Sequence, residues 1–228
     1  MDMPADIVIH WADFFRQHGA DLALGLWTTL HICAVAVSAG ILLGFMVEIL
    51  SRNHILRRRI LRVYIEIFRG TPLLVQLYLL YFGGPAFGLS LEADTAGTVG
   101  LALYAGAYFA EIFRAGFLSI PAGHLEAAHS LGISPLRILW RIELPQMAGL
   151  IVPPSVNQII TLMKDSAVLS IITVTEMTKQ STRIMNESFI IVEPLCLLAL
   201  SYWLLSSLAG WAGRCLEIRL TRHRSLKK

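Results

Sequence analysis

The sequence predicts an all-α integral membrane protein with five transmembrane helices. Three observations support this fold class: an apolar composition, five long apolar runs, and basic residues that cluster in alternate connections between the runs. Of the 228 residues, 55% are hydrophobic and only 15% are charged, whereas a soluble domain carries about 25% charged residues. Disordered chains are poor in large apolar residues, and a soluble two-domain enzyme could not cover this much apolar surface, so both classes are excluded.

Each predicted span is an apolar run of at least the roughly 20 residues that cross a bilayer. The five runs cover residues 22–50, 61–82, 96–118, 148–174 and 189–213. The second and fourth runs contain charges and prolines. Because a broken or charged helix at membrane depth must border a cavity or other protein, we expect these two spans to be interrupted or to line a cavity.

The positions of the Lys and Arg residues predict the orientation. Fourteen lie on one side, in the connections 51–62 and 114–145 and in the basic tail 214–228, and three lie on the other side, at Arg16, Lys179 and Arg183. Cytoplasmic loops carry an excess of Lys and Arg, so we expect the N-terminus outside and the C-terminus in the cytoplasm. This topology accounts for the basic tail, and no nucleic-acid partner is expected.

The N-terminal segment 1–20 is predicted to form an amphipathic helix. Ile7, Trp11, Phe14 and Phe15 fall on one helical face. Such a helix lies either at a membrane surface or packed on the bundle. The segment lacks a basic start, so no cleavable signal peptide is expected.

Polar side chains inside the apolar runs are candidates for a solute pathway, because a charge within a bilayer needs a partner or a function. Proline should break the second run at Gly70-Thr71-Pro72, and residues three or four apart in the fourth run share one helical face. The candidates are Thr71, Gln76, Glu111, Asn157, Thr161, Lys164, Asp165 and Ser166. The same side chains also suit hydrogen bonds between packed helices.

The string Glu-Ile-Phe-Arg occurs twice, and it places Glu66 three residues before Arg69 and Glu111 three residues before Arg114. Residues three apart on a helix are neighbours. Each pair is therefore predicted to neutralise itself, either as an interfacial ion pair or as part of a charged layer at the mouth of a pathway.

The connection 119–145 is predicted to form a helix–turn–helix on the cytoplasmic side. Residues 125–131 suit a short helix that ends at Gly132 in the left-handed conformation. Ser134 suits the cap of a second helix, which we expect to end at Pro145. The first half of this connection has no Lys or Arg, so a DNA-reading role is disfavoured.

No catalytic residue, metal site or cofactor site is predicted in this chain. It lacks the Gly-x-x-x-x-Gly-Lys loop that cradles nucleotide phosphates. His124 and His129 are five residues apart, which is off the spacing of a helical metal pair. Cys33, Cys196 and Cys215 have no paired spacing and are interpreted as small buried hydrophobes.

The connection 119–145 carries a motif that resembles the EAA loop of bacterial ABC importer permeases. Its order and spacing are reproduced by Glu126-Ala127-Ala128, Gly132, Ile142 and Leu144-Pro145. Residues 68–76 (Phe-Arg-Gly-Thr-Pro-Leu-Leu-Val-Gln), residues 107–112 (Ala-Tyr-Phe-Ala-Glu-Ile) and Lys164-Asp165 resemble the polar amino acid uptake branch, a histidine/glutamine permease-like group. The sequence departs from that branch at two places: Ser166-Ala167-Val168 stands where Thr-Ser-Leu is usual, and Gly149 stands where an arginine is common.

This resemblance implies a type I ABC importer permease, a single multi-pass transmembrane domain over 1–228 in a bacterial inner membrane. The loop 119–145 would couple to a separate ATP-binding subunit through Glu126, Ala127, Ala128, Gly132, Leu144 and Pro145. ATP and Mg²⁺ would bind that subunit, and this chain would hold no cofactor and would not be an enzyme. The implied partners are a pair of ATP-binding subunits, a second permease chain (identical or homologous), a periplasmic or lipid-anchored solute-binding protein, membrane lipid, and a polar or charged amino acid or similar solute.

Two other functions fit the residues alone. A stand-alone channel or an ion-coupled secondary carrier for a small polar solute would use the same intramembrane charges, although carriers usually contain internal repeats and this chain repeats only Glu-Ile-Phe-Arg. A membrane scaffold would use the polar groups for packing only. The residues leave open which amino acid is carried and whether the two permease chains are identical.

Overall fold

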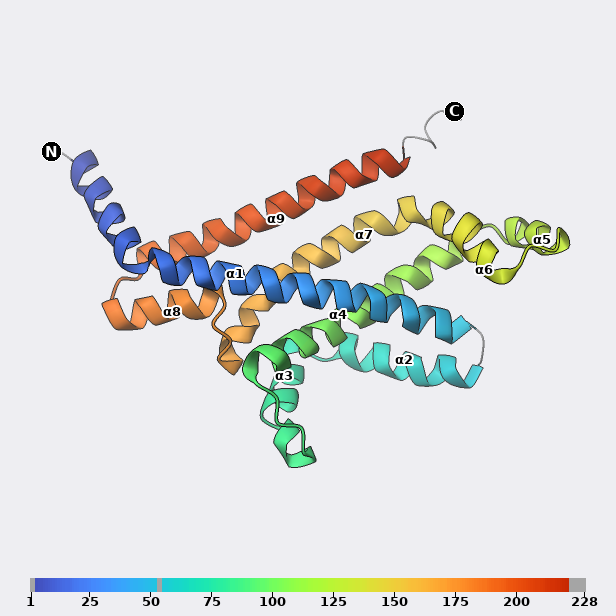
Figure 1. Ribbon diagram of the computed structural model, residues 1–228, viewed down its shortest axis with the longest axis horizontal. Coiled ribbons are helices and arrows are strands. Elements are labelled where there is room, and N and C mark those ends of the chain that lie inside the picture. Colours follow the sequence, from blue (N-terminus) through green and yellow to red (C-terminus); the bar gives the residue numbers. More distant parts are fainter. Residues whose placement is uncertain (1–2, 53–54, 222–228) are drawn as a thin grey trace. The chain divides into compact units, whose positions relative to one another are not determined.

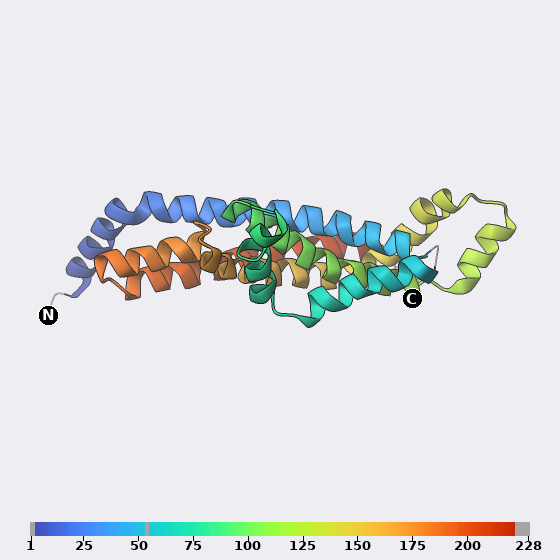
Figure 2. The same ribbon diagram turned by 90° about the horizontal axis from the view of Figure 1, so that it is seen from below.

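The structure is a computed structural model that describes residues 3–52 and 55–221, and every regular element in these ranges is a helix (Figures 1 and 2). The α-helices are α1 (Met3–Arg52), α2 (Ile55–Gly70), α3 (Leu73–Tyr81), α4 (Ala93–Leu118), α5 (Ala122–Ser130), α6 (Pro135–Ile138), α7 (Leu144–Asp165), α8 (Met177–Ser188) and α9 (Val192–Thr221). Two 3₁₀ helices, η1 (Gly84–Phe87) and η3 (Ser166–Ile172), and a π-helix, η2 (Leu139–Glu143), complete the set. The all-α class is confirmed.

The described helices agree with the predicted runs. Three are long and apolar enough to cross a membrane, at Trp11–Arg52, Ala93–Leu118 and Val192–Arg219. Two bent pairs bring the count to as many as five: α2 and α3 meet at 107°, and the helix Pro135–Ile172 meets α8 at 49°. The bend between α2 and α3 confirms the interruption expected in the second run. The fourth run continues as a helix through Pro153 and Pro154 to Ile172, and it meets the other expectation, because its residues line a pocket. The orientation across the membrane stays a prediction.

The helices contribute to two compact units. One contains Met1–Val37, Thr71–Ala102 and Leu162–Ser206, and the other contains Ser38–Gly70, Leu103–Thr161 and Ser207–Lys228. Because α1, α4, α7 and α9 each pass through both units, every unit is assembled from segments that are far apart in the sequence.

In the first unit, the start of α1 packs against α8. Phe14, Leu22, Met177 and Ile184 form a buried cluster, and Arg183 on α8 donates a hydrogen bond of 2.6 Å to Asp21. The N-terminal segment is therefore continuous with the first span, and its described side chains support packing on the bundle rather than an independent surface helix. The side chain of Ile7 and the tail beyond residue 221 lie outside the described part of the chain.

A buried carboxylate organises the turn into α8. Glu176 is fully buried and accepts hydrogen bonds from the backbone N–H groups of Thr178 and Lys179, both at 2.8 Å. The hydroxyl of Tyr202 on α9 also donates to Glu176, at 3.1 Å. The hydroxyl oxygen of Thr29, on α1, accepts a hydrogen bond of 3.1 Å from the backbone N–H of Met177. Because the first N–H groups of a helix lack partners within it, these bonds satisfy the start of α8.

In the second unit, α1 and α4 approach closely through glycines. A Cβ added at Gly44 would lie 2.7 Å from both the backbone nitrogen of Ala110 and the Cβ of Phe109. Small residues at such contacts are typical of packed membrane helices. Beside this contact, the rings of Phe45 and Phe113 pack edge to face, with centroids 5.4 Å apart.

We predict that Gly44→Ala destabilises the protein. The new methyl group would meet backbone atoms that cannot move aside cheaply, and overpacking of this kind costs about 1–3 kcal/mol. The midpoint of thermal unfolding in detergent measures the effect. Gly19→Ala is the matched control, because a Cβ there meets nothing within 4 Å. Equal midpoints for the two variants would contradict the prediction.

Candidate functional site

The segment 119–145 forms a helical hairpin, seen at one end of the second unit (Figure 2). Its first helix, α5, ends in a Schellman motif: Gly132 has φ +69°, its N–H donates to the carbonyl of His129, and the N–H of Ile133 donates to the carbonyl of Ala128. This motif satisfies carbonyl groups that the helix end leaves free. The predicted left-handed stop at Gly132 is confirmed.

Two local expectations for the second helix are wrong. Ser134 occupies the N-cap of α6 as expected, but its side chain makes no capping hydrogen bond. Pro145 does not end the helix, because α6, η2 and α7 form one continuous helical segment within Pro135–Ile172. Proline lacks an N–H and is tolerated in the first turn of a helix. Pro145 sits at that place in α7, directly after the π-helix.

The residues of the EAA-like motif divide by exposure. Glu126, Ala127, Gly132 and Pro145 are exposed, Leu144 is half-buried, and Ala128 is buried. Beside the hairpin, His124 and Gln146 are joined by a side-chain hydrogen bond of 2.9 Å, which links α5 to α7. The hairpin therefore presents small residues outward beside the exposed side chains of Leu131, Leu136 and Trp140, while Ala128 faces inward.

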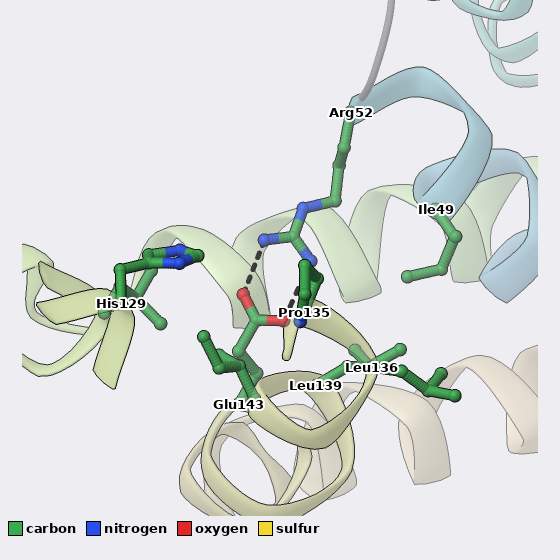
Figure 3. Close-up of a pocket in the computed structure, with 9 residues that line it drawn as sticks. Ile49, Arg52, His129, Pro135, Leu136, Leu139 and Glu143 are labelled. Atoms are coloured by element: carbon green, nitrogen blue, oxygen red, sulfur yellow. Dashed lines mark hydrogen bonds and ion pairs between the residues drawn. The ribbon is translucent and has the colours of Figure 1, made fainter. Parts of the chain in front are cut away.

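An ion pair that local sequence reasoning missed lies beneath the hairpin (Figure 3). Arg52, the last residue of α1, donates from both terminal nitrogens to Glu143 on η2. Both residues border a pocket of about 460 Å³, together with His129, Pro135 and other residues of the hairpin. No periodicity or spacing points to this pair, since its members are 91 residues apart.

A second pocket of about 560 Å³ lies between α4, α7 and the end of α2. It gathers three predicted pathway residues, Glu111, Asn157 and Thr161. The complete lining is Arg69, Tyr108, Glu111, Ile112, Ala115, Gly116, Leu150, Ile151, Pro154, Asn157, Gln158 and Thr161. We call this the α4/α7 pocket. Of the other polar lining residues, Arg69 was predicted only as the partner of Glu66 in a charged layer at the mouth of a pathway, and Tyr108 and Gln158 were not among the pathway candidates.

The charges at the α4/α7 pocket are paired differently from the expectation. Arg114 donates two hydrogen bonds to Glu111, which confirms one of the two predicted pairs. Arg69 forms no ion pair with Glu66; instead its guanidinium carbon lies 5.3 Å from the ring centroid of Tyr108. Among the described residues no carboxylate pairs with Arg69, so its charge remains available at the pocket.

The other five pathway candidates belong to the first unit. Gln76 donates hydrogen bonds to the carbonyl and the hydroxyl of Thr71, at 3.0 and 2.8 Å, so its amide spans the break between α2 and α3. Ser166 is buried and donates to the carbonyl of Met163 at 2.7 Å. Lys164 is exposed and Asp165 is half-buried.

The chain is similar to permeases of binding-protein-dependent transport systems. Residues 40–222 match the family described as "Binding-protein-dependent transport system inner membrane component". A Bacillus subtilis protein named "Probable amino-acid ABC transporter permease protein YckA" is 36% identical over 85% of this chain and 86% of its own length. The "L-cystine transport system permease protein TcyB" of the same organism is 31% identical over 89% of this chain and 87% of its own length.

A solved structure described as an "amino acid ABC transporter with histidines" contains a chain of the same fold. It superposes with a TM-score of 0.82 at 32% identity, and the match covers 90% of this chain and 96% of that chain. This likeness confirms the type I ABC importer permease fold. It also favours the importer over a stand-alone channel or an ion-coupled carrier.

Permeases of this family work with a separate ATPase and with a solute-binding protein, and they perform no catalysis themselves. The chain belongs to the family of binding-protein-dependent transport system inner membrane components and is a multi-pass permease subunit of the inner membrane.

Proposed function

We propose that this chain is the permease of an importer for a polar or charged amino acid or a similar solute, and that segment 119–145 is its coupling loop. One observation carries this proposal: the hairpin and the α4/α7 pocket share a continuous helix. The helical segment that begins at Pro135 runs through η2 into α7, where Asn157 and Thr161 line the pocket. A movement of the hairpin therefore also moves the α7 residues that line the pocket.

The exposed face of the hairpin suits a groove on an ATP-binding subunit. Ala127 and Gly132 allow close approach of a partner surface, and Glu126 adds one carboxylate for orientation. This face is supported by three neighbouring residues of the motif, Ala128, Leu144 and Pro145. ATP and Mg²⁺ bind the partner subunits in this proposal, and this chain holds no cofactor.

The rest of the assembly follows from the same proposal. Two ATP-binding subunits act on two permease chains, which are identical or homologous, and a periplasmic or lipid-anchored protein delivers the solute. The hairpin then lies in the cytoplasm and the N-terminus lies outside, in keeping with the distribution of Lys and Arg. Closure of the ATPases moves the paired hairpins as rigid bodies and switches the permeases between inward-facing and outward-facing states.

The α4/α7 pocket supports an amino acid as the solute. A zwitterion needs a cationic group for its carboxylate and acceptors for its ammonium group. Arg69 supplies a guanidinium that forms no ion pair with a described carboxylate. Asn157 and Thr161 supply neutral hydrogen-bonding groups, and the Glu111 carboxylate lies on the same wall. The names of the two relatives, one an amino-acid and the other an L-cystine permease, agree with this class. Lys164 and Asp165, together with Thr71, Gln76 and Ser166, stay candidates for another part of the pathway.

We predict that Gly132→Trp abolishes ATP-driven uptake while the fold is retained. A residue with a Cβ is disfavoured at φ +69°, and a bulky side chain would hold the partner surface away from the hairpin. Uptake into proteoliposomes that contain the ATPase and the binding protein measures the effect, and circular dichroism measures the fold. Leu200→Trp is the control, because Leu200 is an exposed residue of α9 outside the hairpin. Full uptake by Gly132→Trp would refute the coupling role.

We also predict that Arg69→Met raises the solute concentration for half-maximal uptake by about tenfold or more, because a hydrogen bond to a charged group contributes about 1.5–3 kcal/mol. The assay uses the amino acid that the co-purified binding protein retains. Arg57→Met removes the same charge from an exposed position of α2 that does not line the pocket. If both variants behave alike, Arg69 does not contact the solute.

A further inference from the structure

The C-terminal end of α1 is held to the start of α7 by a bidentate ion pair (Figure 3). Nη1 of Arg52 donates to Oε2 of Glu143 at 3.1 Å, and Nη2 donates to Oε1 at 2.5 Å. The guanidinium carbon also lies 4.3 Å from the ring centroid of Phe117 on α4. The Glu143 side chain is only 6% exposed, and the Arg52 side chain is 34% exposed. Two parallel hydrogen bonds fix direction as well as distance.

No other polar contact replaces this pair. Among the described residues, it is the only ion pair or side-chain hydrogen bond that joins α1 to segment 119–145. Packing is also sparse around it. Arg52 borders the 460 Å³ pocket on the side of His129 and Pro135, and a second pocket of about 410 Å³ on the side of Phe117 and Ala122. The ion pair therefore connects α1 to η2 across a region that is not closely packed.

The π-helix η2 brings Glu143 into position for this contact. The N–H of Leu144 donates to the carbonyl of Leu139, five residues back. In an α-helix, residues five apart point about 140° away from each other, but a π-helix bonds residues five apart and turns them toward the same side. Ile138 and Glu143 are also five residues apart, and both are almost fully buried. A π segment inside a helix frequently marks a functional site.

We propose that Arg52 and Glu143 are positioning residues that make α1 follow the hairpin during the transport cycle. The hairpin is continuous with α7 and follows α4 after a short turn, and both α4 and α7 line the α4/α7 pocket. The ion pair adds α1 to this moving group, and the close contact at Gly44 keeps α1 and α4 together. This inference rests on the proposed role of segment 119–145 as the coupling loop.

A coupling role and a merely stabilising role predict different behaviour when both charges are removed. Removal of one partner leaves a buried charge uncompensated and destabilises the fold, whereas replacement of the whole pair by apolar residues of similar volume is often neutral for stability. The variant Arg52→Met/Glu143→Leu therefore retains the fold but lacks the directional link. Arg52→Lys keeps the charge but loses the bidentate geometry, so it separates the effect of the charge from that of the directional link.

The experiment reconstitutes each variant with its ATPase and binding protein in proteoliposomes. Uptake of a radiolabelled mixture of L-amino acids and hydrolysis of ATP are measured together, and the thermal unfolding midpoint is measured on the same preparations. Arg57→Met is the matched control, since Arg57 is an exposed arginine of α2 and lines none of the pockets around Arg52.

We expect the apolar double variant to import about tenfold less solute per ATP hydrolysed, a typical size for coupling between sites, with an unfolding midpoint close to that of the wild type. Arg57→Met should stay within about threefold of the wild type, and Arg52→Lys should fall between Arg57→Met and the double variant because it keeps the charge without the bidentate geometry. The inference is overturned if the double variant imports normally per ATP, or if Arg57→Met is as defective as the double variant. A wild-type complex without ATP-driven uptake would instead overturn the proposed function.

Discussion

The structure depends on the rule that backbone N–H and C=O groups must be paired inside the chain wherever water is absent. Long helices meet this requirement, and hydrogen bonds satisfy backbone groups at three places where a described helix begins, bends or ends. Glu176 accepts the free N–H groups where α8 begins. Gln76 donates to the carbonyl of Thr71 at the bend between α2 and α3. Gly132 and Ile133 satisfy carbonyls at the end of α5. At these three places, hydrogen bonds outside the regular helical pattern therefore pair backbone groups that the helix leaves without a partner.

Local chemistry predicted the elements, and tertiary contacts decided their continuity. Apolar runs located the three unbroken spans, and glycine chemistry located the turn at Gly132. The same local rules failed at Pro145, because a proline that opens α7 needs no donor and so does not end the preceding helix. They also separated residues 1–20 from the first span, although Phe14 is buried against α8 in the same cluster as Leu22. Whether a helix continues depends on what it packs against, and a single sequence does not show that.

The candidate site was predictable where charges had neighbours on their own helix. Glu111 and Arg114 pair three residues apart, as the spacing requires. Arg69 has Glu66 at the same spacing, yet it lies over the ring of Tyr108 on another helix. Arg52 and Glu143 meet only because α1 and η2 converge. Contacts between residues that are far apart in the sequence leave no periodic signal. For the same reason, the sequence identified Asn157, Thr161 and Glu111 as polar residues but did not show that they are neighbours.

The π-helix η2 has a consequence for how this protein can diverge from its relatives. A π segment holds one residue more than an α-helical segment with the same turn. A single-codon deletion between Leu139 and Glu143 would restore α-helical bonding, and because an α-helical turn closes with one residue fewer, the hairpin would keep its direction relative to α7 with every apolar span left intact. Within this segment the chain can therefore lose or regain one residue without reorienting the hairpin, so the π-helix is the place in the connection where length can vary at little structural cost.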